Sequence, residues 1–357
     1  MANTYGCNNK YTGNTYGEQL EMVCIQEMNI YFFLFFIYIF TKKITSQAGN
    51  IFHMDFPILC FFSSLFLFFD FCRGEGVASF HQNFDVSWGH DHVLALGHGG
   101  TRIQLTMDEH SGWFWFSYTL KVIFLDEIWI GMMFLWDVGC GIMSKLKYGS
   151  GFFRMRLKLP KRDSTAVLHS HTPLHDEVDF EFLGGSKKTI LQTNVYTNGV
   201  GSREQRIHLW FDPTLDFHSY SILWNHYQLV FYIDNIPIRV FKNNTRLGVG
   251  YPTQGMIIEG TLWNGEGWAS NGKPINWREG PFKAIYEGFK IEGCPSEGPI
   301  ISQECETSKY WWNGEKFRQL DPVQQRAYEN VRRKYVNYDY CNDRWRYPEA
   351  PLECQEQ

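Results

Sequence analysis

Short runs of alternating apolar and polar residues fill the middle of the chain, from Phe80 to Lys290. Turn residues separate these runs at intervals of about 8–15 residues, and a period of two residues is that of a half-buried β-strand. The runs are TRIQLTMD, GFFRMRLKL, EVDFEFLG, ILQTNVYT, RIHLWFD, SYSILWN, LVFYIDNIPIRVF and GMIIEGTLWN. The pattern predicts an all-β fold, a jelly-roll β-sandwich, without an internal repeat or a second core.

Two segments carry more specific signals. In LVFYIDNIPIRVF, Asp234 and Asn235 tolerate the dihedral angles of a two-residue turn, so a β-hairpin is expected there. Residues 320–335 are instead typical of a helix, because Asp321 can cap it, Pro322 suits its first turn, and apolar residues recur every four positions.

Near the N-terminus, two apolar runs are each shorter than the ~20 residues that a membrane-spanning helix needs. They are Ile30 to Phe40 and Pro57 to Phe71. The second begins just after Met54 and leads into small residues at Gly74 to Ala78, the order of a secretory signal peptide. We interpret residues 54–78 as a signal peptide and residues 1–53 as an upstream, non-native segment. A hairpin anchor formed by both runs is the alternative.

Charge and composition narrow the possible partners. The formal net charge is −5 and the pI is about 6.2, so the chain lacks the excess of basic residues that is typical of nucleic-acid-binding proteins. Aromatic residues make up 17% of the chain and charged residues 20%, which fits an aromatic-rich β protein able to stack rings on sugars.

Four cysteines lie late in the chain, Cys294, Cys305, Cys341 and Cys354, while Cys140 stands alone after removal of the leader. A secreted protein permits two disulfides, and nearest-neighbour pairing is the simplest of three connectivities. Zinc binding is the alternative, although no C-x-x-C pair supports it.

Residues 113–140 interrupt the strand pattern. The stretch WFWFSYTLKVIFLDEIWIGMMFLWDVGC lacks alternation and turn residues, yet its acidic residues make it a poor membrane span. We treat it as an anomalous insertion, with a retained intron as the working hypothesis.

The strongest candidate chemistry is the run HDEVDFEFLG. Side chains alternate along a strand, so Glu177, Asp179 and Glu181 share one face, and three adjacent acids repel one another. A surface acid ladder or a calcium site is the structural alternative. Glu177 and Glu181 lie roughly 13 Å apart along the strand, and side chains leaning inward approach the ~5–5.5 Å of retaining glycosidases.

In this run and in several others, the sequence resembles the plant xyloglucan endotransglucosylase/hydrolases of glycoside hydrolase family 16. Further matching segments are LQTNVYTNG, SREQRIHLWFDPTLDFHSYSILW, NIPIRVFKN, LWNGEGWASNG and YDYCNDRWRYPEAPLEC. The resemblance implies a catalytic jelly roll over residues 79–290 and a C-terminal extension over residues 291–357. In that extension the cysteine pairs Cys294/Cys305 and Cys341/Cys354 match the family, and the extension resembles an acceptor-side platform.

The resemblance also implies residue roles. Glu177 would be the nucleophile, Asp179 its helper and Glu181 the acid/base. Substrate contacts are expected at Gln192, Thr193, Asn194, Ser202, Arg203, Glu204, Trp263, Gly267, Trp268, Gly272 and Arg346. Amides and guanidinium groups suit sugar hydroxyls, and the two tryptophans suit pyranose faces, although either could belong to the core.

The resemblance therefore implies a secreted, monomeric apoplastic enzyme that cuts and religates xyloglucan, with xyloglucan as donor and xyloglucan or an oligosaccharide as acceptor. No cofactor or metal is expected; a His169, His171 and His175 metal site is the weaker reading. Asn243 begins a glycosylation sequon. Alternatives are a hydrolase, or a defunct wall-binding product, because residues 163–174 are also about five residues shorter than the resemblance leads one to expect.

Overall fold

The structure, a computed structural model, describes residues 80–97, 100–111, 113–124, 127–160, 164–169, 174–183, 189–265, 274–298 and 300–355, with the backbone alone for 113–137 and 164–169. All of them belong to one compact unit, Val77–Gln357. The predicted leader and upstream segment lie outside the described residues.

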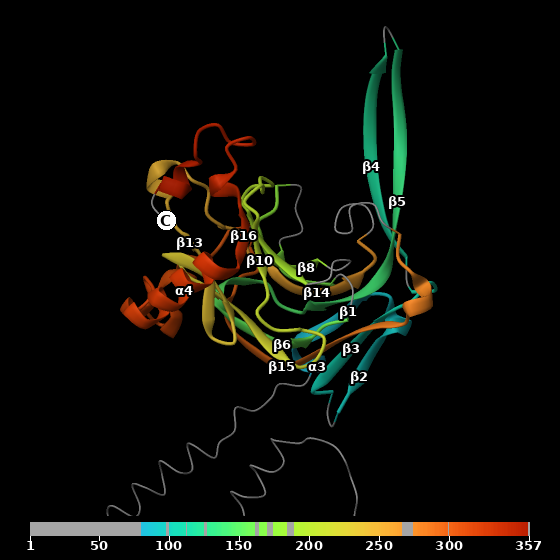
Figure 1. Cartoon of the computed structure of the whole chain (residues 1–357), viewed down its shortest axis with the longest axis horizontal. Helices are drawn as coiled ribbons and strands as arrows, with labels where there is room; N and C mark the ends of the chain where they lie inside the picture. Colours follow the sequence, from blue (N-terminus) through green and yellow to red (C-terminus); the bar gives the residue numbers. More distant parts are fainter. Residues whose placement is uncertain are drawn as a thin grey trace, which may run out of the picture. The chain divides into compact units, whose positions relative to one another are not determined.

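Two antiparallel sheets stack on each other (Figure 1). In order across the first sheet lie β1 (Phe84–Trp88), β5 (Glu127–Ser144), β14 (Ile257–Trp263), β7 (Ser164–His169), β8 (Glu177–Leu183), β9 (Ile190–Tyr196), β10 (Gln205–His208) and β16 (Val336–Asp339), while β4 (Trp113–Phe124) pairs with β5. The second sheet has the order β13 (Ile236–Lys242), β12 (Gln228–Ile233), β11 (His218–Trp224), β6 (Tyr148–Lys158), β15 (Phe282–Pro295), β3 (Arg102–Met107) and β2 (Val93–Leu96). The jelly-roll sandwich is confirmed, and every predicted run contains a strand.

Among the described residues, the helices are short and lie at the edges of the sheets. They are α3 (Phe80–Asn83) and α4 (Pro322–Tyr335), together with the 3₁₀ turns His90–His92, Thr245–Leu247, Trp277–Glu279, Gln303–Glu306, Trp311–Asn313, Glu315–Phe317, Tyr340–Asn342 and Leu352–Gln355. Helix α4 confirms the predicted helix, and its Asp321 side chain accepts hydrogen bonds from the backbone N–H groups of Val323 and Gln324.

The predicted hairpin is also confirmed. Strands β12 and β13 pair around Asp234 and Asn235, whose φ angles are 47° and 65°. Both residues therefore occupy the left-handed region that a tight hairpin turn requires, and asparagine and aspartate reach this region at lower cost than most residues.

Aromatic side chains from both sheets meet in the core. Phe180 of β8 lies edge-on to Phe231 of β12, with ring centroids 5.3 Å apart. Arg239 of β13 is buried in the same layer, and its guanidinium donates hydrogen bonds to the carbonyls of Thr193 and Arg203. A buried charge that bonds to backbone oxygens avoids part of its desolvation cost and fixes the sheets against each other.

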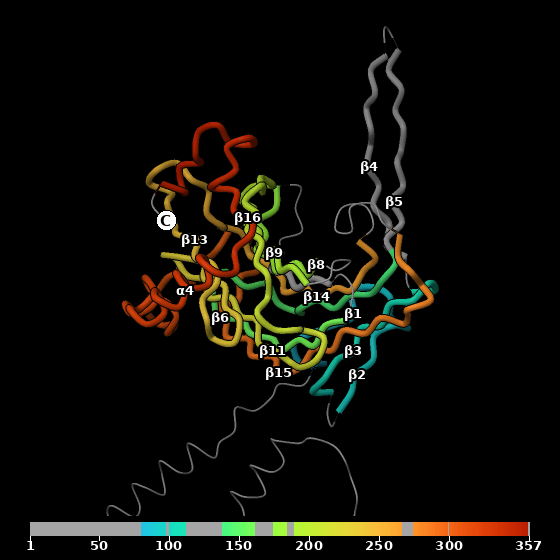
Figure 2. The backbone as a smooth tube through the Cα atoms, viewed as in Figure 1, coloured from blue at the N-terminus to red at the C-terminus, as the bar shows by residue number. Residues whose placement is uncertain are grey.

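The C-terminal segment completes the first sheet. Strand β16 pairs with β10, with Gln205 opposite Asp339, so a segment late in the sequence lies beside strands from the middle of the chain (Figure 2). Both expected disulfides are present, with Cα–Cα distances of 5.4 Å for Cys294–Cys305 and 5.5 Å for Cys341–Cys354. They fasten the two ends of this segment.

The interrupting stretch 113–140 forms β4 and most of β5. Among the described strands, β4 pairs only with β5, from Trp113 opposite Val138 to Phe124 opposite Glu127. Gly139 and Cys140, in contrast, pair with Trp263 and Leu262 of β14, and Cys140 is fully buried. These two residues belong to the sandwich, so an insertion here has to end before Gly139.

The shortened region before the catalytic strand still supplies β7. All six residues of Ser164–His169 pair with β8, and each also pairs with β14. The sheet is therefore continuous across this position. Among the described residues, no helix has the length and apolar character needed to cross a bilayer.

Candidate active site

Strand β8 carries the three predicted acids on the outer face of the first sheet. Val178, Phe180 and Phe182 point the other way and are at most 2% exposed. This alternation confirms that Glu177, Asp179 and Glu181 share one face. The packing of the apolar residues fixes the strand, and the strand therefore fixes the spacing of the acids.

Asp179 and Glu181 are held from the neighbouring strand β9. The backbone N–H of Asn194 donates to Asp179 Oδ1 at 2.6 Å, and Gln192 Nε2 donates to Glu181 Oε2 at 2.5 Å. Gln192 in turn accepts a hydrogen bond from Arg206 Nε at 2.7 Å. Each carboxyl group is thus oriented by one residue directly across the ladder.

Glu177 has a different partner. His175 Nε2 lies 3.1 Å from Glu177 Oε2, and the imidazole stacks on Tyr196 with ring centroids 5.3 Å apart. Tyr196 is directly opposite Glu177 on β9. Glu177 therefore has a ring nitrogen as its neighbour, whereas Glu181 has an amide.

Burial raises the pKa of two of the acids, Glu181 and Asp179. Burial raises the pKa of Glu181 to about 7, with a further rise from the charge of Glu177, while the Gln192 hydrogen bond opposes it. The pKa of Asp179 is raised well above its ordinary value by burial and then by the charges of Glu181 and Glu177. Glu181 is therefore protonated in part near neutral pH, and the pKa of its neighbour Asp179 is shifted in the same direction.

Not every residue expected to bind substrate lies on this face. Thr193 is fully buried on the core side of β9, where Arg239 Nη1 donates to its Oγ1 at 3.0 Å. Asn194 shares the acids' face but is 3% exposed, and its Oδ1 accepts from the N–H groups of Val195 and Arg203. The structure therefore gives Thr193 and Asn194 supporting positions.

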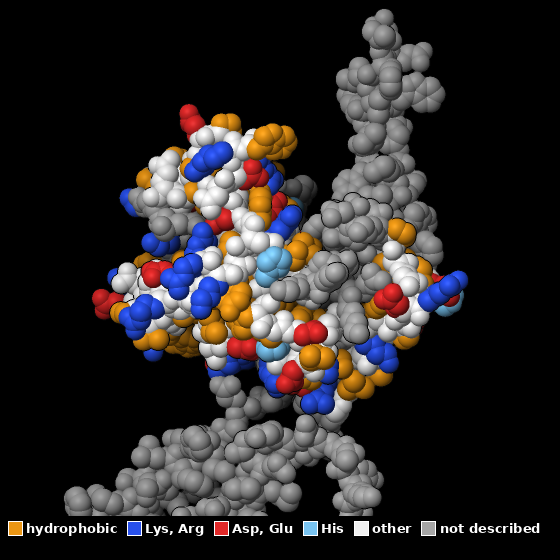
Figure 3. All heavy atoms as spheres, viewed as in Figure 1, with side chains coloured by type: hydrophobic (Ala, Val, Ile, Leu, Met, Phe, Trp, Pro, Cys, Tyr) orange, Lys and Arg blue, Asp and Glu red, His pale blue; other side chains and the backbone are white. Residues whose placement is uncertain are grey.

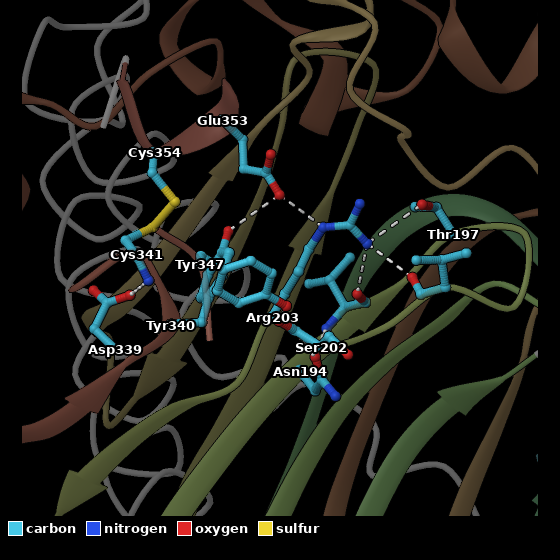
Figure 4. Close-up of polar contacts among 12 residues, drawn as sticks. Asn194, Thr197, Ser202, Arg203, Asp339, Tyr340, Cys341, Tyr347, Glu353 and Cys354 are labelled. Carbon is cyan, nitrogen blue, oxygen red and sulfur yellow. Dashed lines mark hydrogen bonds and ion pairs between the residues drawn. A yellow bond between two sulfur atoms is a disulfide. The ribbon is translucent and has the colours of Figure 1, made fainter. Parts of the chain in front are cut away.

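Arg203 joins the catalytic sheet to the C-terminal segment (Figure 4). Its Nε lies 2.9 Å from Glu353 Oε1, next to the Cys341–Cys354 disulfide, and its Nη1 donates to the carbonyls of Val195 and Val200. Tyr347 OH donates to the carbonyl of Ser202. Arg203 and the Ser202 backbone thus act as a clamp between the two parts.

The second ion pair at this junction is more exposed. Arg346 Nη1 lies 2.8 Å from Glu204 Oε2, with 36% of the arginine side chain exposed. Glu204 precedes β10, and Arg206, two residues later, places its guanidinium over the ring of Tyr338 at 5.2 Å. This pair extends the polar face of β8 toward β16.

Strand β14 forms the other side of the site. Its buried residues Ile258 and Leu262 alternate with the half-buried Glu259, Thr261 and Trp263, so Trp263 lies on the acids' face as expected. The expected contacts Gly267, Trp268 and Gly272 lie outside the described residues.

Sequence reasoning missed several neighbours of the acids: Tyr196, Arg206, Arg239 and Glu259. Glu259 is separated from Asp179 by one residue of β7, and burial followed by the charge of Glu177 raises its pKa to about 7. Alternation along a strand predicts the face on which each residue lies. The order of the strands, however, is known only from the structure, and it places Glu259 of β14 one strand away from β8.

The remaining predictions concern a metal and a glycan. Within the described residues, no group of three potential metal ligands comes together. His175 pairs with Glu177 instead, while His171 lies outside the described residues. Asn243 is half-buried and its Nδ2 donates to the carbonyl of His226 at 2.8 Å, so the sequon stays a prediction.

Two family models and several curated proteins match this chain. The model of "Glycosyl hydrolases family 16" matches residues 80–279, and that of "Xyloglucan endo-transglycosylase (XET) C-terminus" matches residues 306–354. An Arabidopsis thaliana protein named "Xyloglucan endotransglucosylase/hydrolase protein 2" is 46% identical over 306 residues, covering 82% of this chain and 95% of that protein.

Other relatives are similar. A "Xyloglucan endotransglucosylase/hydrolase" of Brassica oleracea var. botrytis is 42% identical over 287 residues, covering 77% of this chain and 87% of its own. A solved Bacillus licheniformis β-glucanase is 19% identical, with a TM-score of 0.44 over 59% of this chain and 92% of its own. The family matches show that the chain belongs to glycosyl hydrolases family 16, and within it to the xyloglucan endotransglucosylase/hydrolases.

Proposed function

We propose that this protein is a xyloglucan endotransglucosylase that cuts a β-1,4-glucan backbone and joins the new end to another chain. The observation that carries the proposal is the row of three acids on one face of β8, in which burial raises the pKa of Asp179 and of Glu181. The names of the relatives indicate xyloglucan as the polysaccharide, and the three acids provide the groups needed to break and re-form a glycosidic bond.

In the first step, the Glu177 carboxylate attacks the anomeric carbon while the glycosidic C–O bond breaks. Glu181, protonated in part at neutral pH, gives its proton to the leaving oxygen. The product is a glycosyl ester on Glu177. Asp179 lies between the two on the strand, and its raised pKa favours the protonated form, which can donate a hydrogen bond to Glu177 and limit charge repulsion in the row.

In the second step, Glu181 acts as a base. It takes the proton from an acceptor hydroxyl, whose oxygen attacks the anomeric carbon and releases Glu177. The configuration is retained because the two displacements each invert it. No metal or cofactor is needed in this scheme.

Transfer rather than hydrolysis requires that an acceptor sugar outcompetes water at the ester. The C-terminal segment supports this, because β16 and the Arg346–Glu204 pair enlarge the polar face on one side of β8. We assign the acceptor to that side, and the donor to the side of β7 and β14. The disulfides support a secreted, apoplastic protein, and we propose that it acts as a monomer.

The test mixes xyloglucan with a labelled xyloglucan oligosaccharide and follows two products. Label should enter high-molecular-mass polymer faster than new reducing ends appear. Reducing ends rising without label incorporation, at saturating acceptor, would show a hydrolase. Glu177→Ala should abolish both products, whereas the matched change Glu349→Ala, at an exposed acid of the C-terminal segment, should leave both unchanged.

A further inference from the structure

Trp345 lies in the C-terminal segment with its side chain in solvent. Among the large apolar side chains that the structure describes, it has the greatest exposed fraction, 95%, and Leu215 follows with 73%. An exposure of this size leaves both faces of the indole in contact with water. Aromatic side chains contribute to the stability of a fold mainly when they are buried, so this indole adds almost nothing to the packing of the segment.

The turn that carries Trp345, residues 344–346, is held by the residues around it. Asp343 Oδ1 accepts from the N–H of Arg346 at 3.0 Å, and Asp343 Oδ2 accepts from Tyr338 OH at 2.9 Å. These two contacts, followed by one from the N–H of Trp345, lower the pKa of Asp343. The N–H of Tyr347 donates to the carbonyl of Asp343 at 2.8 Å. The exposed ring therefore extends from a backbone that a ligand does not have to order.

Tyr338 is connected to Glu181 by one row of residues across the sheet. Glu181 is opposite Gln192, Gln192 opposite Arg206 and Arg206 opposite Tyr338. Residues directly opposite each other point to the same face, so Tyr338 lies on the face of the acids. Three strand spacings separate Glu181 from Tyr338, about 14 Å at ~4.8 Å per strand. Through the Tyr338–Asp343 hydrogen bond, the turn with Trp345 lies at the end of this row.

Polar groups suited to sugar hydroxyls lie beside the same turn. They are the hydroxyl group of Tyr338 and the guanidinium of Arg346, whose charge is compensated by Glu204 at 2.8 Å. An exposed aromatic ring next to polar groups that are held in place is the composition of a site for a neutral sugar, which binds by stacking and hydrogen bonds.

We propose that Trp345 is an acceptor-binding residue, whose indole stacks on a pyranose ring of an acceptor chain that extends past Tyr338. This proposal rests on the proposed function, which assigns the acceptor to the side of β16. An acceptor that begins at Glu181 and follows the row has to span about 14 Å before it passes Tyr338. Trp345 therefore favours long acceptors over short ones.

The experiment measures transfer by the full chain at saturating donor xyloglucan. Two labelled xyloglucan oligosaccharides serve as acceptors, one with a backbone longer than about 20 Å and one with a backbone shorter than about 10 Å. Trp345→Ala should raise KM for the long acceptor about tenfold. It should leave kcat, KM for the short acceptor and KM for the donor unchanged. An unchanged KM for the long acceptor would overturn the proposal.

Two further variants separate stacking from general apolar contact. Trp345→Phe keeps a flat ring, whereas Trp345→Leu keeps an apolar side chain without a flat face, so the first should raise KM for the long acceptor less than the second. Equal increases would refute stacking. The matched control is Leu215→Ala, which removes an exposed apolar side chain between β10 and β11 and should leave KM for both acceptors unchanged.

The remaining outcomes are also decisive. Trp345→Ala should keep the melting temperature of the parent, and a large fall would show that the indole is packed in the native protein and would refute the proposal. A rise in KM of equal size for both acceptors would refute it as well, because the short one does not reach Trp345. If the parent transfers label from neither acceptor, the proposed function itself fails, and the role of Trp345 fails with it.

Discussion

At the scale of single residues, Arg206 and Gln192 control the proton on Glu181. Arg206 lowers the pKa of Glu181 through its charge, and it also holds the amide that hydrogen-bonds to this carboxyl group. Both effects oppose the rise that burial causes. The pKa of Glu181 is therefore about 7, because these two contacts partly offset the effect of its desolvation.

Arg206→Met should consequently move the alkaline limb of the pH–activity profile upward. Removing the guanidinium takes away a positive charge and releases Gln192, and both changes favour the protonated form of Glu181. The measurement is kcat/KM for the donor against pH. A limb that stays in place or moves to lower pH contradicts Glu181 as the acid. Arg246→Met, at an exposed arginine, is the control.

Glu181→Gln should stabilise the protein at alkaline pH while abolishing activity. The folded-state pKa of about 7 lies above the ordinary value of 4.5, so the unfolded state releases its proton first as pH rises. The contribution of this carboxyl group to the free energy of unfolding is therefore fully present below about pH 4.5 and is lost as pH rises through about 7. Glutamine does not titrate and can still accept from Gln192.

The check is urea unfolding of both proteins at about pH 5 and about pH 8. We expect the variant to gain stability over the parent at the higher pH, on the order of 2 kcal/mol, and little at the lower one. A gain confined to acidic pH would mean that the pKa of Glu181 is lowered by folding.

At the scale of elements, the contact between the catalytic sheet and the C-terminal segment depends on Arg203 and Glu353. Both side chains are nearly buried, at 12% and 9% exposure, and Tyr340 also donates to Glu353. A partly buried ion pair with hydrogen bonds costs more to break than an exposed one.

Glu353→Gln should therefore lower the free energy of unfolding by about 1–3 kcal/mol, because Arg203 loses the charge that faces it. It should also raise KM for the acceptor more than KM for the donor, since the acceptor-side segment would loosen. Thermal unfolding and separate acceptor and donor titrations measure the two effects. Glu349→Gln, in the same segment but exposed, serves as the control, and equal KM changes for donor and acceptor would count against the clamp.

Local patterns were sufficient to predict most elements. Alternation placed Val178 and Phe180 in the core, and the Asp321–Pro322 signal placed the start of α4. Pairing between distant strands was not readable in the same way, because ladder partners are set by the whole sheet. This is why Glu259 was missed, and why Thr193, which resemblance placed in the cleft, turns out to bond to Arg239 in the core.

At the scale of the whole chain, charge does not indicate a polyanionic partner. Lys and Arg side chains are interspersed with Asp and Glu on the face shown in Figure 3. With a net charge of −5, this mixed surface suits a neutral polysaccharide, which is bound by stacking and hydrogen bonds rather than by charge.

Removing residues 113–138, with Gly112 joined to Gly139, should make the chain more soluble without unfolding the sandwich. Within the part of the chain that the structure describes, β4 pairs only with β5, and its sequence together with the first part of β5 is dominated by tryptophan, phenylalanine, isoleucine and methionine. Large apolar stretches of this kind promote association between molecules when they extend beyond the edge of a sheet. Gly139 and Cys140 must stay, because they pair with β14 and Cys140 fills the core.

Size-exclusion chromatography with light scattering measures the monomeric fraction of the parent and of two shortened chains. The 113–138 deletion should raise that fraction and keep the melting temperature. The 113–140 deletion is the matched comparison and should lose stability, since a buried side chain and one end of a ladder disappear with it. If the 113–138 deletion aggregates more than the parent, the stretch is packed structure of the native protein, and the retained-intron hypothesis is wrong.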